Sequence, residues 1–176
     1  MLLPELRKLV PAYVLCLNLM SLARNAQRLA KLLEQSEQRV VFAESCTGGL
    51  VAATMAQIPG ISDWLCGSTV TYRGDCKIKW LGVEASDVKR NQAVNPAVAR
   101  QMAALVLTKT PEAAIAGAIT GHLGPGAGSL DGVVYTGVAK RQGKTVTQRH
   151  NLTTATRRQR QREAAALLLE QVADML

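Results

Sequence analysis

One serine stands where a predicted strand turns into a predicted helix, in the stretch 43–49 (Ala-Glu-Ser-Cys-Thr-Gly-Gly). Val40 to Phe42 is an apolar run, β-branched and aromatic, that is typical of a buried strand, and residues 50–56 indicate a helix. The first turn of a helix has unpaired backbone N–H groups and the positive end of the helix dipole. Ser45 is therefore expected beside a site that suits an oxyanion or a phosphate.

A serine becomes a good nucleophile only when a base removes its proton. Lys77 can be that base if burial or nearby positive charge lowers its pKa; otherwise it is an exposed helix lysine. Cys46 raises the alternative of a thiol nucleophile, but no histidine lies nearby in the sequence to generate the thiolate. Ser45 also has a structural alternative, as the N-cap of the helix that follows, and the two roles are compatible.

Three strand ends carry the candidate catalytic groups: Ser45, Tyr72 with Lys77, and Thr120. Ligands of an open α/β sheet bind outside the carboxyl ends of its strands, so we expect these groups to meet in one crevice. Tyr72 would hold the lysine or the substrate, or would only pack its ring. Thr120 would donate to the substrate, or would cap the glycine-rich loop that follows it.

Backbone amides are the predicted substrate-binding groups. Those of Cys46 and Thr47 would stabilise a tetrahedral oxyanion, and one such donor typically lowers the barrier by about 3 kcal/mol. Glycines let a ligand approach the backbone closely. Those predicted to contact phosphate or carboxamide are Gly48, Gly49, Gly121 and Gly124. Glu44 would orient the loop around Ser45 or cap a backbone amide.

The motifs of the chain follow one another in the order 43–49, Pro59-Gly60, Val70-Thr71-Tyr72, Lys77, Leu81-Gly82-Val83, Ala93-Val94 and Thr120-Gly121-x-x-Gly124-Pro125. In this order they resemble the CinA carboxy-terminal domain family, which includes the stand-alone bacterial nicotinamide-nucleotide amidases. The resemblance extends from about Leu22 to the end of the chain. Its most specific part is the run Glu-Ser-Cys-Thr-Gly-Gly.

The resemblance implies an amidohydrolase that uses neither a metal nor a cofactor. Its substrate would be nicotinamide mononucleotide, a small nucleotide, and its products nicotinate mononucleotide and ammonia. An arginine near the start of the last helix is also implied, and Arg158 or Arg162 matches it best. The residues that match the family's catalytic positions are Ser45 as nucleophile, Lys77 as the assisting lysine, and Tyr72 and Thr120 as supporting polar residues.

The chain departs from the family's usual pattern at the predicted pocket. His122 stands where an aliphatic residue is usual, and it would contact substrate, share in proton transfer, or point into solvent. Arg73-Gly74-Asp75 replaces the usual Ser-Asn-Glu, and the loop 126–131 is short. These changes keep two alternatives open: a nucleotide-binding module that has lost the reaction, and a competence- or DNA-damage-associated module that binds nucleic acid.

The composition favours a single globular domain, because 48% of the residues are hydrophobic and 19% are charged. The formal net charge is +8, and every charged residue from Lys140 to Arg162 is basic. This segment is either a solvated basic face or a partner for an anion. Aromatic residues make up 3% of the chain, so bases have few side chains to stack on and nucleic-acid binding is not expected.

The cysteines and the start of the chain indicate a cytoplasmic protein. The four cysteines form no C-x-x-C pair, so we expect reduced thiols and no zinc site. The apolar run Leu9 to Met20 is too short to cross a bilayer and lacks a good signal-peptide cleavage site, so no membrane partner is expected. Residues 1–19 are interpreted as an extension upstream of a start at Met20, and residues 20–176 as the amidase-like domain. A homo-oligomer is compatible with the sequence.

The order of the expected helices and strands, which must position these groups, predicts an α/β fold. We expect a single-domain three-layer sandwich, with a mixed, mostly parallel sheet and helices on both faces. Helices are expected at 21–35, after Ser45, at 75–80 with Asp75 as a cap, at 96–108 with Asn95 as a cap, and at 155–175. Strands are expected from Arg39, at 68–72, at 113–119, and in an antiparallel pair at 132–139 and 145–151.

Overall fold

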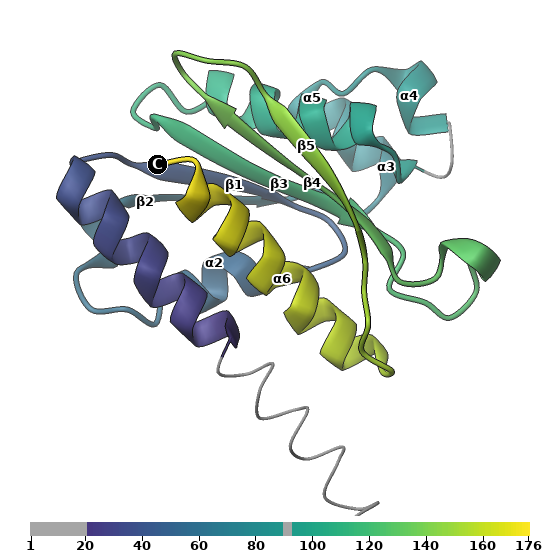
Figure 1. Cartoon of the computed structure of the whole chain (residues 1–176). Helices are drawn as coiled ribbons and strands as arrows, with labels where there is room; N and C mark the ends of the chain where they lie inside the picture. Colours follow the sequence, from purple (N-terminus) through teal and green to yellow (C-terminus); the bar gives the residue numbers. More distant parts are fainter. Residues whose placement is uncertain (1–20, 90–92) are drawn as a thin grey trace, which may run out of the picture.

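The computed structural model describes residues 21–89 and 93–176, so the predicted extension 1–19 lies outside the described residues. A five-stranded sheet in the order β2-β1-β3-β4-β5 forms its centre (Figure 1). β1 is parallel to β2 and β3, and β4 is antiparallel to β3 and β5, so only β4 runs against the others. The strands are β1 Val40–Glu44, β2 Leu65–Val70, β3 Ile115–Gly121, β4 Val133–Lys140 and β5 Val146–Asn151.

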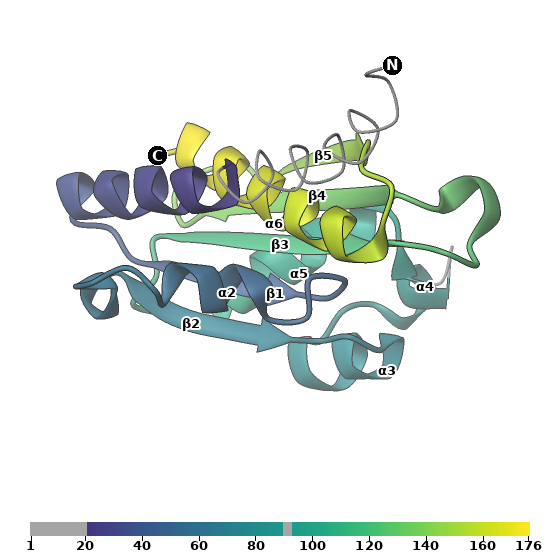
Figure 2. The ribbon, with the colours of Figure 1, turned by 90° about the horizontal axis from the view of Figure 1, so that it is seen from below.

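Helices cover both faces of the sheet, as Figure 2 shows. A helix of residues 21–36, α2 (Leu50–Met55) and α6 (Arg157–Asp174) pack on one face. The other face carries α3 (Gly74–Cys76), the π-helical turn η2 (Lys77–Leu81), α4 (Ala85–Lys89) and α5 (Pro96–Thr108). Short 3-10 turns complete the described elements, at Ile61–Asp63 (η1) and Gly128–Leu130 (η4). The predicted mixed α/β sandwich is thus confirmed.

Successive residues of a strand point to opposite faces of a sheet, and β3 uses this alternation to serve two cores. Ile115 and Ile119 pack with α6, whereas Ala116 and Ala118 pack with α5. Glycines bring the helices close to the strands. A Cβ atom on Gly117 would lie 2.8 Å from Val172 of α6, and one on Gly137 would lie 2.5 Å from the Ala99 carbonyl oxygen of α5.

Of the two helix-capping residues predicted from the sequence, one is confirmed and one is wrong. The Asn95 side chain accepts a hydrogen bond from the Val98 amide at 3.0 Å and caps α5, as predicted. Asp75 was expected to cap the next helix along from β2, which is wrong: α3 has Arg73 as its N-cap residue, and the Asp75 carboxylate instead accepts from Arg73 Nε at 3.0 Å. Among the described residues, no helix is long and apolar enough to cross a membrane.

Candidate active site

Ser45 follows β1 directly, but it does not cap α2. The N-cap residue of that helix is Gly49, whose φ of 96° is in the left-handed region that glycine tolerates best. Gly48 has a φ of 62°. Neither Gly48 nor Gly49 lies in the wall of the cavity described below. These two glycines therefore serve the backbone turn between β1 and α2, and the predicted contact with a ligand in this cavity is not seen.

The carboxylate of Glu44 binds the start of α2 in place of a serine cap. Glu44 is fully buried, and its side chain accepts hydrogen bonds at 2.9–3.1 Å from the amides of Gly49, Val51 and Ala52 and from the hydroxyl of Ser68. An ionised carboxylate is a strong acceptor for helix N-terminal amides. The positive end of α2 is thus already satisfied from inside the protein.

The backbone amides of the turn before the helix are bound differently. The amides of Cys46 and Thr47 donate to no carbonyl or carboxylate in the described part of the chain, whereas the Gly48 amide is bound to the Ser45 carbonyl at 3.0 Å. Thr47 itself is fully buried and does not line the cavity. Its carbonyl accepts from Gln161 of α6 at 2.7 Å, which ties the turn to that helix.

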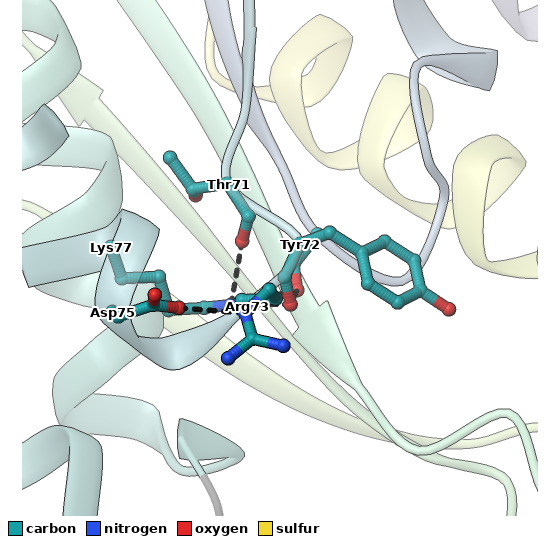
Figure 3. Close-up of polar contacts among 6 residues, drawn as sticks. Thr71, Tyr72, Arg73, Asp75 and Lys77 are labelled. Atoms are coloured by element: carbon teal, nitrogen blue, oxygen red, sulfur yellow. Dashed lines mark hydrogen bonds and ion pairs between the residues drawn. The ribbon is translucent and has the colours of Figure 1, made fainter.

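Lys77 is the first residue of η2, and its side chain reaches the serine from that turn. Its Nζ atom donates to Ser45 Oγ at 2.8 Å and to the Thr71 carbonyl at 2.8 Å, with the Tyr72 carbonyl at 3.5 Å. Figure 3 shows the lysine running to the Thr71 carbonyl while the Tyr72 ring extends away from it. The predicted meeting of an alcohol and an amine is thus present.

Burial shifts the pKa of Lys77, the candidate base, and of Cys46, the alternative nucleophile. Only 2% of Lys77 is exposed, and this desolvation lowers its pKa from 10.5 to about 8, although the nearby thiols of Cys46 and Cys76 oppose the shift. The amine is therefore neutral in about a tenth of the molecules at pH 7. Burial also raises the pKa of the Cys46 thiol to about 12, so that thiol stays protonated and is a poor nucleophile.

A cavity of about 330 Å³ opens beside Ser45 and Lys77. Five chain segments form its wall: the turn after β1, the segment after β2, Val94 just before α5, the end of β3 with the glycine-rich loop after it, and the start of α6. The predicted site residues that line it are Ser45, Cys46, Tyr72, Lys77, Thr120, Gly121, His122 and Gly124. Those that do not line it are Thr47, Gly48, Gly49, Arg158 and Arg162.

The arginine in the cavity wall is Arg157, in place of Arg158 or Arg162. Its Nη1 donates to the Gly124 carbonyl at 2.7 Å and its Nη2 to the Tyr72 hydroxyl at 2.8 Å. Successive helical residues point about 100° apart, so Arg158 and Arg162 lie on other sides of α6 than Arg157. Arg160, three positions on, donates to the Thr154 carbonyl at 2.9 Å and to the Leu123 carbonyl at 3.1 Å. The sequence did contain a signal for this register: Thr156 and Gln159 form a capping box, which fixes Arg157 as the first helical residue.

Thr120 and His122 lie at the carboxyl end of β3, next to the carboxyl end of β1 that Ser45 follows. The Thr120 hydroxyl donates to the Ala93 carbonyl at 2.9 Å, so its proton is used inside the protein and is not available for the predicted donation to substrate. The backbone of His122 continues the ladder with β4: its amide donates to the Val133 carbonyl at 2.9 Å, and its carbonyl accepts from Gly132 at 2.7 Å. The half-buried His122 is thereby held in the cavity wall.

Asp131 also lines the cavity and was missed in the sequence analysis. Its two carboxylate oxygens accept from the consecutive amides of Ala127 at 2.8 Å and Gly126 at 3.2 Å. Among the residues that the structure describes, it is the only Asp or Glu in the cavity wall, where Lys77 and Arg157 bring positive charge. An acidic residue at the end of a glycine-rich loop was the available signal. Within 21–89 and 93–176, no group of His, Cys, Asp and Glu side chains could hold a metal ion.

The fold and the motifs of this chain recur in known proteins. Residues 22–176 match the family model of the CinA C-terminal domain. A CinA-like protein of Thermosynechococcus vestitus is 40% identical over 124 residues, which is 68% of this chain and 29% of that protein. A putative competence-damage inducible protein of Clostridioides difficile is 37% identical over 145 residues, 81% of this chain and 34% of that protein.

A solved structure, the competence/damage inducible protein CihA from Agrobacterium tumefaciens, superposes with a TM-score of 0.83 at 30% identity, covering 88% of this chain and 95% of that one. The chain spans about a third or less of the length of the curated relatives it matches. Because the family model covers nearly the whole chain, the match concerns the domain that carries Ser45 and Lys77. This chain belongs to the CinA C-terminal domain family.

Proposed function

We propose that the protein is an amidohydrolase that converts the carboxamide of nicotinamide mononucleotide to a carboxylate, releasing ammonia. Ser45 is the nucleophile and Lys77 the base, and the reaction is written with these two groups and no metal ion. The observation that carries the proposal is the 2.8 Å hydrogen bond between Lys77 Nζ and Ser45 Oγ, in the wall of a cavity large enough for a small ligand.

In the first half of the reaction, neutral Lys77 removes the Ser45 proton as Oγ attacks the carboxamide carbon. The carbonyl oxygen becomes an oxyanion, which the amide of Cys46, the one of the two predicted donors that lines the cavity, stabilises. Lys77 then gives its proton to the amide nitrogen, the C–N bond breaks, and ammonia leaves. The product of this half is an ester between Ser45 and the nicotinate group.

In the second half, neutral Lys77 removes a proton from a water molecule that attacks the ester carbon. A second tetrahedral oxyanion forms and collapses, and Lys77 returns the proton to Ser45 Oγ as the ester bond breaks. One amide and one water have been consumed, and one carboxylic acid and one ammonia have been produced, which exchange a proton in water to give carboxylate and ammonium. Lys77 must be neutral at the start of each half, which a pKa near 8 permits close to neutral pH.

An anionic substrate is supported by the charges around the cavity. Lys77 and Arg157 donate only to neutral oxygens, so neither charge is neutralised by a carboxylate in the described part of the chain. A guanidinium group can bind a phosphate through two parallel hydrogen bonds. The half-exposed ring of Tyr72 offers a surface for a positively charged pyridinium ring. Nicotinamide mononucleotide carries both groups.

The test is an ammonia-release assay with nicotinamide mononucleotide. The intact protein should release ammonia, and Ser45→Ala and Lys77→Ala should each lose at least about a thousandfold in kcat. Lys79→Ala is the matched control, because Lys79 lies in the same π-helical turn but is exposed to solvent. It should keep its activity.

Calorimetric titration with the nucleotide separates this proposal from a binding module. Turnover by the folded Ser45→Ala variant would refute the mechanism. Tight nucleotide binding by a folded wild-type protein that releases no ammonia would refute the proposed activity and favour binding alone.

A further inference from the structure

The glycine-rich loop after β3 holds an anion of its own. The carboxylate of Asp131 spans two consecutive backbone amides, those of Gly126 and Ala127. Gly126 has a φ of 118° and the nearby Gly128 a φ of 58°. Successive amides in such a loop form a concave group of donors that suits an anion, and phosphates bind to loops in this way. Here an internal carboxylate holds that position.

The position of this carboxylate matters because it lies in the wall of the candidate active site. Gly126 is exposed, Ala127 is half-buried, and both residues line the cavity beside Asp131. The same stretch of loop also contacts two arginines: Arg157 donates to the Gly124 carbonyl, and an ideal Cβ on Gly124 would lie 2.8 Å from Arg160 Nη1 and 3.0 Å from the Asp131 carboxyl carbon. Arg157 and the two residues that carry these amides therefore line the same cavity.

We infer that Asp131 is an internal competitor for an anion subsite formed by Arg157 and the amides of Gly126 and Ala127, and that the ligand of this subsite is a phosphate monoester. When the phosphate enters, it takes over the amides and the Asp131 carboxylate turns away. Asp131 thus sets the affinity of the cavity for anions without touching the reacting carboxamide. The subsite lies in the cavity of the proposed active site. Only the identity of the phosphate ester depends on the proposed function.

The chemistry of like charges gives the expected effect. A carboxylate a few ångströms from a phosphate at a partly exposed site weakens phosphate binding by on the order of tenfold. Asp131→Asn removes the charge but keeps one oxygen acceptor for the loop. Asp131→Ala removes both acceptors and leaves the two amides open. If Asp131 only holds the loop in shape, both changes should instead weaken phosphate binding, because the amides lose their arrangement.

The first experiment measures binding of inorganic phosphate at constant ionic strength, by calorimetry or by the phosphate-dependent rise in melting temperature. Asp131→Asn should bind phosphate on the order of tenfold more tightly than wild type, and Asp131→Ala at least as tightly as Asp131→Asn. Asp63→Asn is the matched control, because it makes the same change in net charge at an exposed residue outside the cavity wall, and it should bind like wild type. Circular dichroism checks the fold of every variant.

A second experiment compares nicotinamide mononucleotide with its riboside, which lacks the phosphate. Asp131→Asn should lower KM for the nucleotide with little change in kcat, and should leave the riboside unaffected. If both folded Asp131 variants bind phosphate no more tightly than wild type, the inference is wrong even when ammonia is released. If they bind it more tightly but no ammonia is released, the inference holds and the proposed activity falls.

Discussion

The Nζ atom of Lys77 lies 2.8 Å from the Oγ atom of Ser45, across a separation of 32 residues in the chain. Each group reaches this point from a different strand end: Ser45 directly follows β1, and Lys77 begins the π-helical turn beyond β2. Parallel pairing of β1 with β2 places both strand ends at the same edge of the sheet. The pair is thus a product of the sheet order as much as of the two side chains.

Activity should rise with pH up to about pH 8. Burial lowers the pKa of Lys77 to about 8. Below that pH, each increase of one pH unit makes the neutral amine about tenfold more abundant. We expect log kcat/KM to rise with a slope near one and to level off above about pH 8. A profile measured from pH 6 to pH 9.5 checks this. Lys77→Arg should be inactive throughout, because its guanidinium stays protonated. A flat profile would argue against a lysine base.

The buried lysine should also make stability depend on pH. Its folded pKa of about 8 lies below the 10.5 of an exposed lysine, so the protonated form is disfavoured by folding. The resulting destabilisation, up to about 3 kcal/mol, is fully present below pH 8 and is relieved as the pH rises toward 10.5. Lys77→Met should therefore be at least as stable as wild type at pH 7, with the difference shrinking by pH 10. Urea unfolding at the two pH values measures it. Greater stability of the wild type at pH 7 would contradict this account.

Arg157 should control substrate affinity more than turnover. Removing its guanidinium takes away the cavity's exposed cation and the bridge to Tyr72 and Gly124. We expect Arg157→Ala to raise KM for nicotinamide mononucleotide about tenfold to a hundredfold, with a much smaller change in kcat. Steady-state kinetics measure both constants. Arg158→Ala makes the same change in net charge outside the cavity wall and should be close to wild type. An equal loss in both variants would show that only the overall charge matters.

Glu44 should be essential for stability. Its buried carboxylate satisfies three amides of α2 and the Ser68 hydroxyl. Glu44→Gln keeps the shape but turns an NH₂ group toward some of these donors, which should lower the free energy of unfolding by about 2–4 kcal/mol. The melting temperature should then fall by about 5–15 °C. Calorimetry checks this against Glu34→Gln, an exposed control on the helix of residues 21–36. Equal melting temperatures would mean that the amides find other acceptors.

Some predictions succeeded because they depend on neighbours in the chain. The apolar run before Ser45, the Asn95-Pro96 start of α5 and the glycine-rich loop after β3 are local patterns, and each forms the expected element. The choice of Arg158 or Arg162 failed because it depends on the exact register of a helix. One residue of shift turns a side chain by about 100°, enough to move it out of the cavity.

The amino-acid sequence by itself was enough to predict the alternation of strands and helices, to identify the family, and to single out the serine and the lysine. These predictions depend only on residue types and on their spacing along the chain. Only the tertiary structure decided that Lys77 is buried against Ser45, that Glu44 rather than Ser45 caps α2, and that Asp131 holds the loop amides. These facts depend on contacts between distant segments. Desolvation and hydrogen-bond partners, which set the charge and the reactivity of a side chain, exist only after the sheet has brought those segments together.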